Sequence, residues 1–260
     1  MVSSLEIPPG ASVDLATRDP DSTPGAPGDR QRTEAVYEAQ HLHLAALQGR
    51  LWAEGTRGLL AVLQAIDTGG KDGTIQHVFR GFNPSGTRVA TFRVPTEQEA
   101  AHDFLWRVHS QVPRAGEVVV FNRSHYEDVL VTRVHRLVPP HVIQGRYEHI
   151  NAFERLLHDA GTHIVKFLLH ISYEEQGRRL EQRRTDPDKR WKFKESDLAE
   201  RAHWAEYQAA FTTMLEKTST EHSRWHVIPS NHKWYRNWAV TEILLQVLEK
   251  MDPQFPAAPT

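Results

Sequence analysis

Residues 59–79 read LLAVLQAIDTGGKDGTIQHVF, and this stretch decides the fold. Its first five residues are apolar, as in a buried strand of a parallel sheet. Gly69, Gly70 and Gly73 then surround Lys71, and an amphipathic segment follows. A strand, a glycine-rich loop and a helix N-terminus can cradle phosphate, because backbone N–H groups turn towards the anion without side chains in the way. The stretch therefore predicts a phosphate site in an α/β fold.

The loop departs from the P-loop consensus G-x-x-x-x-G-K-[ST] at two positions. Ala65 occupies the place of the leading glycine, and Asp72 follows Lys71 where Ser or Thr is usual. Asp67 and Asp72 flank the lysine, and carboxylates repel phosphate unless a divalent cation lies between them. A hard metal ion, Mg²⁺ or Mn²⁺ in its place, is therefore expected. The alternative is an ordinary glycine-rich turn with exposed charges.

Composition limits the class of protein and its partners. The chain has 260 residues, of which 25% are charged and 39% hydrophobic, so it suits one sizeable α/β domain or two small ones. The formal net charge of −2 gives no basic surface for nucleic acid, and no apolar stretch has the length of a membrane span. Cysteine is absent, which excludes disulfides and thiolate metal sites and fits a cytoplasmic protein. We expect neither nucleic acid nor membrane as a partner.

The chain alternates strand and helix patterns between two polar ends. Residues 1–31 and the proline-rich residues 252–260 are expected to be a flexible arm and a flexible tail. Residues 32–251 predict one three-layer α/β/α sandwich with a parallel sheet, because the elements alternate with short connections. The expected strands are 59–63, 92–94, 118–121, 164–171 and 225–228, and the expected helices are 32–54, 97–112 (opened by a capping box at 96–99), 129–137, 147–160 and 233–250.

A basic segment at residues 174–218 precedes the last expected strand, and Pro187 divides it into two helices. Arg179 and Arg183 are four residues apart and share a helix face, and arginine suits bidentate contact with phosphate. We favour a mobile, phosphate-binding helical lid over a solvated charged surface, which the acidic residues of the segment would also fit. The aromatic residues of the second helix have the spacing of core residues. The cations are Arg178, Arg179, Arg183, Arg184, Lys189, Arg190, Lys192 and Lys194.

Polar residues directly follow the expected strand at 118–121, where parallel sheets bind ligands. These motifs occur in one order: DTGGKDGT at 67–74, PTE at 95–97, HDFLWR at 102–107, FNRSHYED at 121–128 and the arginine-rich lid. In this combination the chain resembles the family-2 polyphosphate kinases, from about Arg32 to the closing helix. The resemblance implies a P-loop kinase-like core with a helical lid, Mg²⁺, and reversible phosphoryl transfer between inorganic polyphosphate and a nucleotide.

One departure from that family bears directly on metal binding. Many members have Asp, the Walker B metal ligand, where this chain has Asn122, which can coordinate a metal or hold its water but brings no charge. His125 and Glu127 replace the Trp and Asn frequent in this motif. This form of the motif resembles the subgroup that phosphorylates both nucleoside mono- and diphosphates. The resemblance implies AMP, ADP and ATP as nucleotides, with guanine nucleotides also in range, and a homo-oligomer, either a dimer or a tetramer.

The residues and the resemblance together assign roles in catalysis. Lys71 and Arg123 neutralise charge on the transferring group. Asp67 binds the metal, with Asn122 as a second metal residue, and orients the acceptor phosphate; its alternative is a strand-end cap. Glu127 acts on the acceptor side, and its alternative is a helix-start carboxylate.

Further candidates bind phosphate or nucleotide. Lys233 and Arg236 follow the last expected strand and can reach polyphosphate, although a solvated helix face would also explain them. The others lie around the loop or in the lid: Gly69, Gly70, Asp72, Gly73, Thr74, Arg178, Arg183 and Arg184.

Two other functions remain open. The same loop and lid would serve a nucleoside monophosphate kinase that uses ATP as donor. A non-catalytic protein that binds polyphosphate or nucleotide through a decayed P-loop is motivated by Ala65, Asp72 and Asn122. The presence of both Asp67 and Lys71 favours an enzyme.

Overall fold

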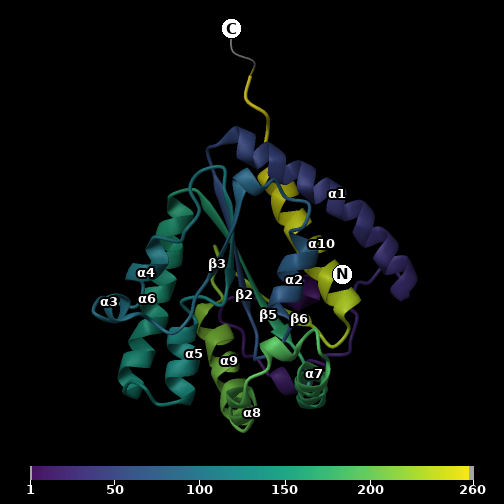
Figure 1. Ribbon diagram of the computed structural model, residues 1–260. Helices are drawn as coiled ribbons and strands as arrows, with labels where there is room; N and C mark the ends of the chain where they lie inside the picture. The colour runs from purple at the N-terminus through teal and green to yellow at the C-terminus, as the bar shows by residue number, and fades with distance from the viewer. Residues whose placement is uncertain (1, 258–260) are drawn as a thin grey trace.

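A single mixed sheet runs through the middle of the molecule (Figure 1). The computed structural model describes residues 2–257. In this part of the chain the strand order is β1-β6-β5-β2-β4-β3, and every neighbouring pair is parallel except β1 with β6. The predicted parallel α/β sheet is confirmed, with one antiparallel strand added at its edge. The strands are β1 (Glu6–Ile7), β2 (Gly58–Gln64), β3 (Thr87–Thr91), β4 (Val118–Asn122), β5 (Thr162–His170) and β6 (Trp225–Pro229).

Helices cover both faces of the sheet, which gives the predicted three layers (Figure 1). One layer contains α1 (Arg30–Glu54), α2 (Lys71–Val78) and α10 (Lys233–Met251). The opposite layer contains α5 (Glu127–Val134), α6 (Pro140–Asp159) and α9 (Trp204–Thr218). The shorter helices are α3 (Glu97–Ala100), α4 (Trp106–His109), α7 (Tyr173–Thr185) and α8 (Glu195–Arg201), with 3₁₀ turns at Val2–Leu5, Leu15–Thr17, Pro84–Gly86 and Arg190–Lys192.

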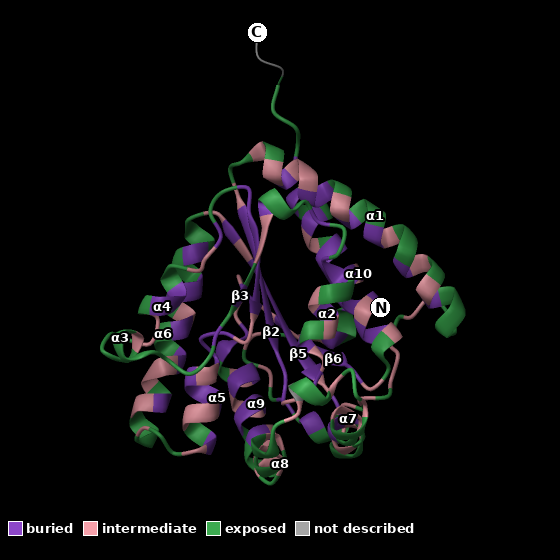
Figure 2. Cartoon of the chain, viewed as in Figure 1, coloured by how far each residue is buried: buried purple, intermediate pink, exposed green. Residues whose placement is uncertain are grey.

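The apolar run of β2 is explained by burial on both faces (Figure 2). Leu60 and Val62 belong to the core beneath α5, α6 and α9, and Leu59, Ala61 and Leu63 belong to the core beneath α1 and α10. A strand covered by helices on both sides has no polar face, so its sequence does not alternate. The strand ends inside the protein, where the phosphate loop begins.

The N-terminal segment packs on the domain, and the expectation of a separate flexible arm is wrong. Val2, Leu5 and Ile7 are buried, and Ile7 pairs with Trp225 at the sheet edge. Glu6 also forms a 2.6 Å ion pair with Arg224. Proline, glycine and polar residues set the composition of this segment, while its few apolar side chains cover the open edge of β6. Met1 and residues 258–260 of the expected tail lie outside the described residues.

Two expected elements before β4 are corrected. The strand placed at 92–94 lies earlier, at β3, and the helix placed at 97–112 is two short helices, α3 and α4. The capping box is present, because Thr96 and Glu99 exchange side-chain-to-backbone hydrogen bonds. Asp103 accepts a hydrogen bond from the Leu105 backbone N–H at 3.0 Å. This local turn competes with helical hydrogen bonding and explains the break between the two helices.

The expected lid at 174–218 is divided differently from the prediction. The second helix, expected after Pro187, is interrupted between α8 and α9, which are separated at residues 202–203. Tyr207, Phe211 and Leu215 of α9 are buried in the core, as their spacing predicted. The segment that stands clear of the sheet is therefore α7, the following 3₁₀ turn and α8 (Figure 1). Among the described residues, no helix has the length and apolar character needed to cross a membrane.

Candidate active site

The loop after β2 is shaped by its glycines. Gly70 has φ +107° and is the N-cap of α2, a conformation that side chains rarely adopt. A Cβ on Gly69 would lie 2.4 Å from the Cβ of Ala65, so the alanine in place of the consensus glycine fits only because residue 69 has no side chain. The loop therefore turns sharply and presents the N-terminus of α2, where an anion is favoured.

Lys71 is the first residue of α2 and is only 9% exposed. Its Nζ donates a hydrogen bond to the carbonyl oxygen of Ala65 at 2.8 Å. Burial and the nearby Arg123 lower the pKa of Lys71 to about 8, although the carboxylates of the site oppose this shift. In the described residues no carboxylate lies within ion-pair distance of its ammonium group. A phosphate oxygen would supply the missing negative charge.

Arg123 connects two carboxylates beside this lysine. Its guanidinium is 2.6 Å from Asp67 Oδ1 and 3.2 Å from Glu127 Oε2. Burial alone would lower the pKa of Arg123, but Glu127 and Asp67 raise it. Burial raises the pKa of Glu127 despite the neighbouring cations. The backbone of Arg123 has φ +63°, a strained conformation for arginine, and its N–H donates to the carbonyl oxygen of Leu63 in β2 at 3.2 Å.

Asn122 lies next to Asp72 and donates a hydrogen bond from Nδ2 to Asp72 Oδ1 at 2.9 Å. Its amide oxygen, with the carboxylates of Asp67 and Asp72, forms a set of hard oxygen donors around the loop. The described residues contain no cluster of three or more His, Cys, Asp or Glu side chains that could hold a metal by themselves. This donor set nevertheless fits Mg²⁺, which takes one or two carboxylates and completes its shell with water and substrate phosphates.

A pocket opens between the loop and α9 on the Arg123 side. Its polar lining is Asp67, Arg123, Glu127, Glu200 and Tyr207. Tyr207 donates a 2.8 Å hydrogen bond to Glu200, which ties α9 to α8 beside this pocket. The apolar lining is Ala65, Ile66, Leu130, Val131 and Phe211. The charged side of this pocket gives a phosphate group a place to face Arg123.

A second group of cations lies on another side of the loop. Arg236 of α10 is only 2% exposed, and its guanidinium donates to Asn237 Oδ1 at 2.8 and 3.2 Å. A Cβ on Gly70 would lie 2.1 Å from Arg236 Nη1, so the guanidinium rests on the loop backbone. Burial and the nearby Arg179 lower the pKa of Arg236 to about 9. A buried cation with no carboxylate partner among the described residues is a site for an anionic ligand.

Arg179 of α7 is the second cation of this group. The sequence did not assign it to the site. Its guanidinium donates to the carbonyl oxygens of Thr68 at 3.1 Å and Ser230 at 2.6 Å, and it pairs with Glu175. Burial and the neighbouring Arg179 and Arg236 lower the pKa of Lys233, which places Lys233 in the same positive field. Lys233 and Arg236, both predicted to bind phosphate, therefore lie on the same side of the loop.

The other predicted lid arginines are each paired with an acidic residue of the lid. Arg178 is paired with Glu175 and is 61% exposed, and Arg184 forms an exposed pair with Glu181. Arg183 lies 3.4 Å from Asp197 of α8. Contact between these three side chains and a ligand stays a prediction.

The sequence carries no signal for Glu200, a charged residue on a short helix. It placed Tyr207 in the core only, and it grouped Arg179 with the other lid cations because spacing along α7 does not say which arginine turns inward. The loop residues Gly69, Gly70, Lys71, Gly73 and Thr74 lie together as predicted.

A parallel sheet, a glycine loop and a buried lysine at a helix N-terminus define a kinase of the P-loop type. The family model described as Polyphosphate kinase 2 matches residues 28–256. The chain belongs to this family and is a phosphotransferase that uses polyphosphate.

Individual relatives agree with this assignment. The chain is 53% identical to an AMP/ADP-polyphosphate phosphotransferase of Meiothermus ruber, over 100% of this chain and 97% of that protein. It is 37% identical to an ADP-polyphosphate phosphotransferase of Rhodopseudomonas palustris, over 86% of each chain. The crystal structure of Polyphosphate Kinase 2 from Arthrobacter aurescens TC1 superimposes with a TM-score of 0.96 at 46% identity, covering 99% of this chain and 92% of that one.

Proposed function

We propose that this enzyme transfers the terminal phosphoryl group of inorganic polyphosphate to AMP and to ADP, reversibly and with Mg²⁺. The observation that carries the proposal is the buried cation group on both sides of one loop, with Lys71 and Arg236 free of carboxylate partners among the described residues. A polyphosphate chain carries negative charge on every phosphate, so it can contact several such cations at once. The relative named as an AMP/ADP-polyphosphate phosphotransferase supports the choice of acceptors.

The two sides of the loop would hold the two substrates. Arg179, Lys233 and Arg236 would bind polyphosphate, and the pocket beside Arg123 would bind the nucleotide with its phosphate towards Lys71. An oxygen of the acceptor phosphate attacks the terminal phosphorus while the bond to the next bridging oxygen breaks, and the shortened polyphosphate leaves with those electrons. Lys71 and Arg123 stabilise the charge on the transferring group throughout.

Asp67, Asp72 and Asn122 would hold Mg²⁺ through their oxygen atoms. When bound, the metal neutralises phosphate charge that the carboxylates of the loop would otherwise repel. Manganese has similar ligand preferences and is expected to substitute.

Dual acceptor specificity requires that the acceptor phosphate, and not the base, is held at a fixed distance from Lys71. AMP is one phosphate shorter than ADP, so its nucleoside must lie deeper or shallower in the pocket. Glu127 lines that pocket, beside Arg123. A bare carboxylate would repel AMP, so Glu127 would act through Arg123, the metal or a metal-bound water.

The proposal also covers further acceptors, the cellular compartment and the oligomeric state. Guanine nucleotides are included as acceptors, because a relative from Mycobacterium tuberculosis, 31% identical, is named as a GDP-polyphosphate phosphotransferase. We also propose that the enzyme is cytoplasmic, where nucleotides are found, and that it assembles as a dimer or a tetramer. The alternative donor, ATP, would use the same loop and is distinguished by experiment.

The acceptors are tested with the purified protein, Mg²⁺ and polyphosphate, with AMP or ADP supplied separately and products resolved over time. ADP from AMP and ATP from ADP are expected, with neither in excess EDTA. Glu127→Asn is expected to weaken AMP phosphorylation more than ADP phosphorylation. Product from ADP and none from AMP would refute the dual specificity, and full turnover in EDTA would refute the metal requirement.

A further inference from the structure

A charged residue, Lys166, lies in the middle of β5, between the buried apolar residues Val165 and Phe167. Lys166 of β5 stands opposite Val62 of β2 and Trp225 of β6, and its side chain is 0% exposed. Its ammonium group is 2.6 Å from Glu154 of α6, whose side chain is also 0% exposed. Neither residue touches the phosphate loop or its pocket, so the transfer chemistry does not use them directly.

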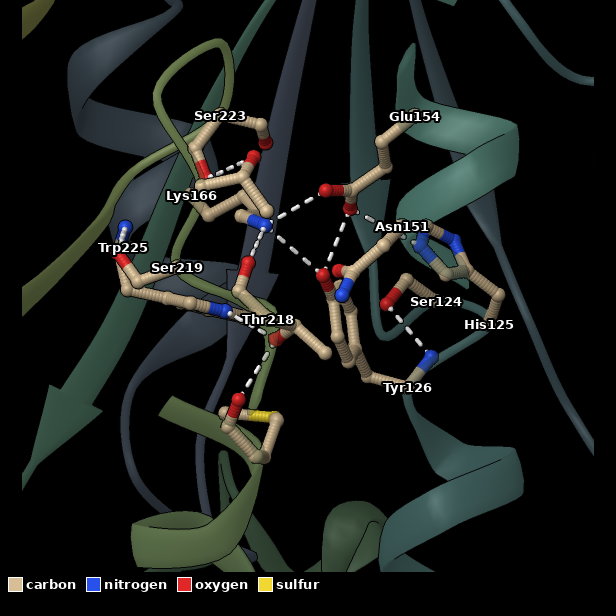
Figure 3. Close-up of polar contacts among 12 residues, drawn as sticks. Ser124, His125, Tyr126, Asn151, Glu154, Lys166, Thr218, Ser219, Ser223 and Trp225 are labelled. Atoms are coloured by element: carbon tan, nitrogen blue, oxygen red, sulfur yellow. Dashed lines mark hydrogen bonds and ion pairs between the residues drawn. The ribbon is translucent and has the colours of Figure 1, made fainter. Parts of the chain in front are cut away.

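The ion pair is part of a larger buried network (Figure 3). Lys166 Nζ also donates to the Tyr126 hydroxyl at 2.9 Å and to the carbonyl oxygen of Thr218 at 2.6 Å. The Tyr126 hydroxyl donates to Glu154 Oε1 at 2.7 Å, and a His125 ring nitrogen lies 3.3 Å from the same oxygen. The three donors of the ammonium group are thus all used, by one acceptor each from α6, the loop after β4 and the end of α9.

The net effect of this network on folding stability does not by itself explain why it is present. Two buried charges lose their hydration, and a well-packed apolar set of similar volume is often as stable or more stable. Burial alone would raise the pKa of Glu154, but Lys166 and His125 hold it at about 2, so the carboxylate keeps its charge. Among the described residues His125 Nδ1 has no partner, but the hydrogen bonds that join Lys166, Glu154 and Tyr126 fix one arrangement of their elements more strictly than apolar packing does.

Two of the joined elements carry the acceptor site. Tyr126 stands between Arg123 and Glu127, and its backbone N–H donates to Ser124 Oγ at 3.1 Å. Holding the tip of the Tyr126 ring therefore fixes the turn that aims both charged side chains. Thr218 is the last residue of α9, and the first turns of that helix carry Tyr207, which lines the pocket.

We propose that the Glu154–Lys166–Tyr126 network is a positioning device for phosphoryl transfer, which sets Arg123 and Glu127 at a fixed distance from α9. Its three residues are positioning residues, because they act through Arg123 and Glu127 and touch no substrate. The inference rests on the proposed function for its kinetic consequence. Loss of one tether should lower kcat, because a small misplacement of the charged groups weakens contact with the transferring group. The KM for polyphosphate should not change, since the cations at Arg179 and Arg236 are held separately.

The test uses Tyr126→Phe, which removes one hydroxyl group and keeps the ring and the Lys166–Glu154 pair. The matched control is Tyr37→Phe on the opposite face of the sheet, where a buried hydroxyl donates to the carbonyl oxygen of His77 at 2.6 Å. Tyr126→Phe is expected to lower kcat with AMP about tenfold at unchanged KM for polyphosphate, and Tyr37→Phe is expected to keep the wild-type kcat. Wild-type kcat in Tyr126→Phe, or an equal loss in both variants, would overturn the proposal.

A second measurement does not depend on the reaction. Hydrogen exchange of the ligand-free proteins should be faster at the amides of residues 123–130 in Tyr126→Phe and unchanged there in Tyr37→Phe. Equal exchange in both variants would also overturn the proposal. A wild-type protein that transfers no phosphoryl group from polyphosphate would refute the proposed function, while the exchange measurement would still decide whether the tether exists.

Discussion

Lys71 shows how one buried charge can be both costly and useful. The ammonium group gives up most of its water and has a single backbone acceptor, so its charged form is less favoured than in an exposed lysine. A phosphate group restores the lost interaction. The protein thereby holds a cation that is ready for a phosphate before the substrate arrives, which is the arrangement that electrostatic catalysis requires.

The low pKa of Lys71 predicts a pH dependence. A lysine is charged below its pKa, so the free protein loses this charge as pH rises through about 8. We expect kcat/KM, which reports on the free enzyme, to fall across that range. Bound phosphate favours the charged form, so the fall in kcat should lie at higher pH. Initial rates across the range check both, and a kcat/KM that stays flat from about pH 7 to about pH 9.5 would contradict this role for Lys71.

Gly70 gives a second prediction for a single residue. Gly70→Ala would place a Cβ 2.1 Å from Arg236 Nη1 in a backbone with φ +107°, so the loop or the arginine must move. We expect loss of most activity and a lower melting temperature. Gly145→Ala is the matched control, because that helical glycine has open space around it and the change should stabilise the protein by about 0.5–1 kcal/mol. Thermal unfolding and turnover of both variants check this, and a fully active Gly70→Ala would contradict the loop geometry.

Local sequence could predict the residues of the loop and not those that approach it from elsewhere. Lys71, Asp67 and Arg123 follow the ends of apolar strands, so a short pattern places them at one edge of a parallel sheet. Arg179 and Glu200 enter through the packing of α7 and α8, which no short spacing encodes. Arginine and glutamate are common on solvated helices, so the sequence did not single out these two residues.

The same contrast holds for whole elements. β2, β4 and β6 were predicted close to their observed bounds because both of their faces are apolar. The prediction of one helix at 97–112 was wrong at Asp103, because the Asp103 side chain accepts the backbone hydrogen bond of Leu105 in place of a helical carbonyl oxygen. β1 was missed because a two-residue edge strand has no period of its own, and its place is set by pairing with β6.

Helix α7 yields a prediction that separates its two faces. Arg179 is 5% exposed and holds the carbonyl oxygens of the loop, while Arg178 beside it points to solvent. Arg179→Lys loses the bidentate geometry of arginine, so the KM for polyphosphate should rise about tenfold or more. Arg178→Lys is the matched control and should change KM less than about twofold at moderate salt. Steady-state kinetics of both variants check this. An equal rise of the KM for polyphosphate in Arg179→Lys and Arg178→Lys would contradict it and would mean that the lid reorients before it binds polyphosphate.

At the scale of the whole molecule, the sheet sets the site by bringing its parts to one edge. The phosphate loop follows β2, the Asn122–Asp128 motif follows β4, and α10 follows β6, so three connections meet where the parallel strands end. The fold class was predictable because the alternation of strands and helices constrains it. The strand order and the contact between α7 and the loop depend on long-range packing and were not predictable from short patterns.

The central claim is that polyphosphate, and not ATP, donates the phosphoryl group at this loop. The most direct measurement supplies purified protein with Mg²⁺ and AMP, adds either polyphosphate or ATP, and quantifies ADP for the wild type, Lys71→Ala and the remote surface control Lys250→Ala. We predict ADP from polyphosphate without any ATP present, a loss of about 10²-fold or more in Lys71→Ala, and wild-type turnover in Lys250→Ala. ADP formed only when ATP is supplied, or an unchanged rate in Lys71→Ala, would contradict the account.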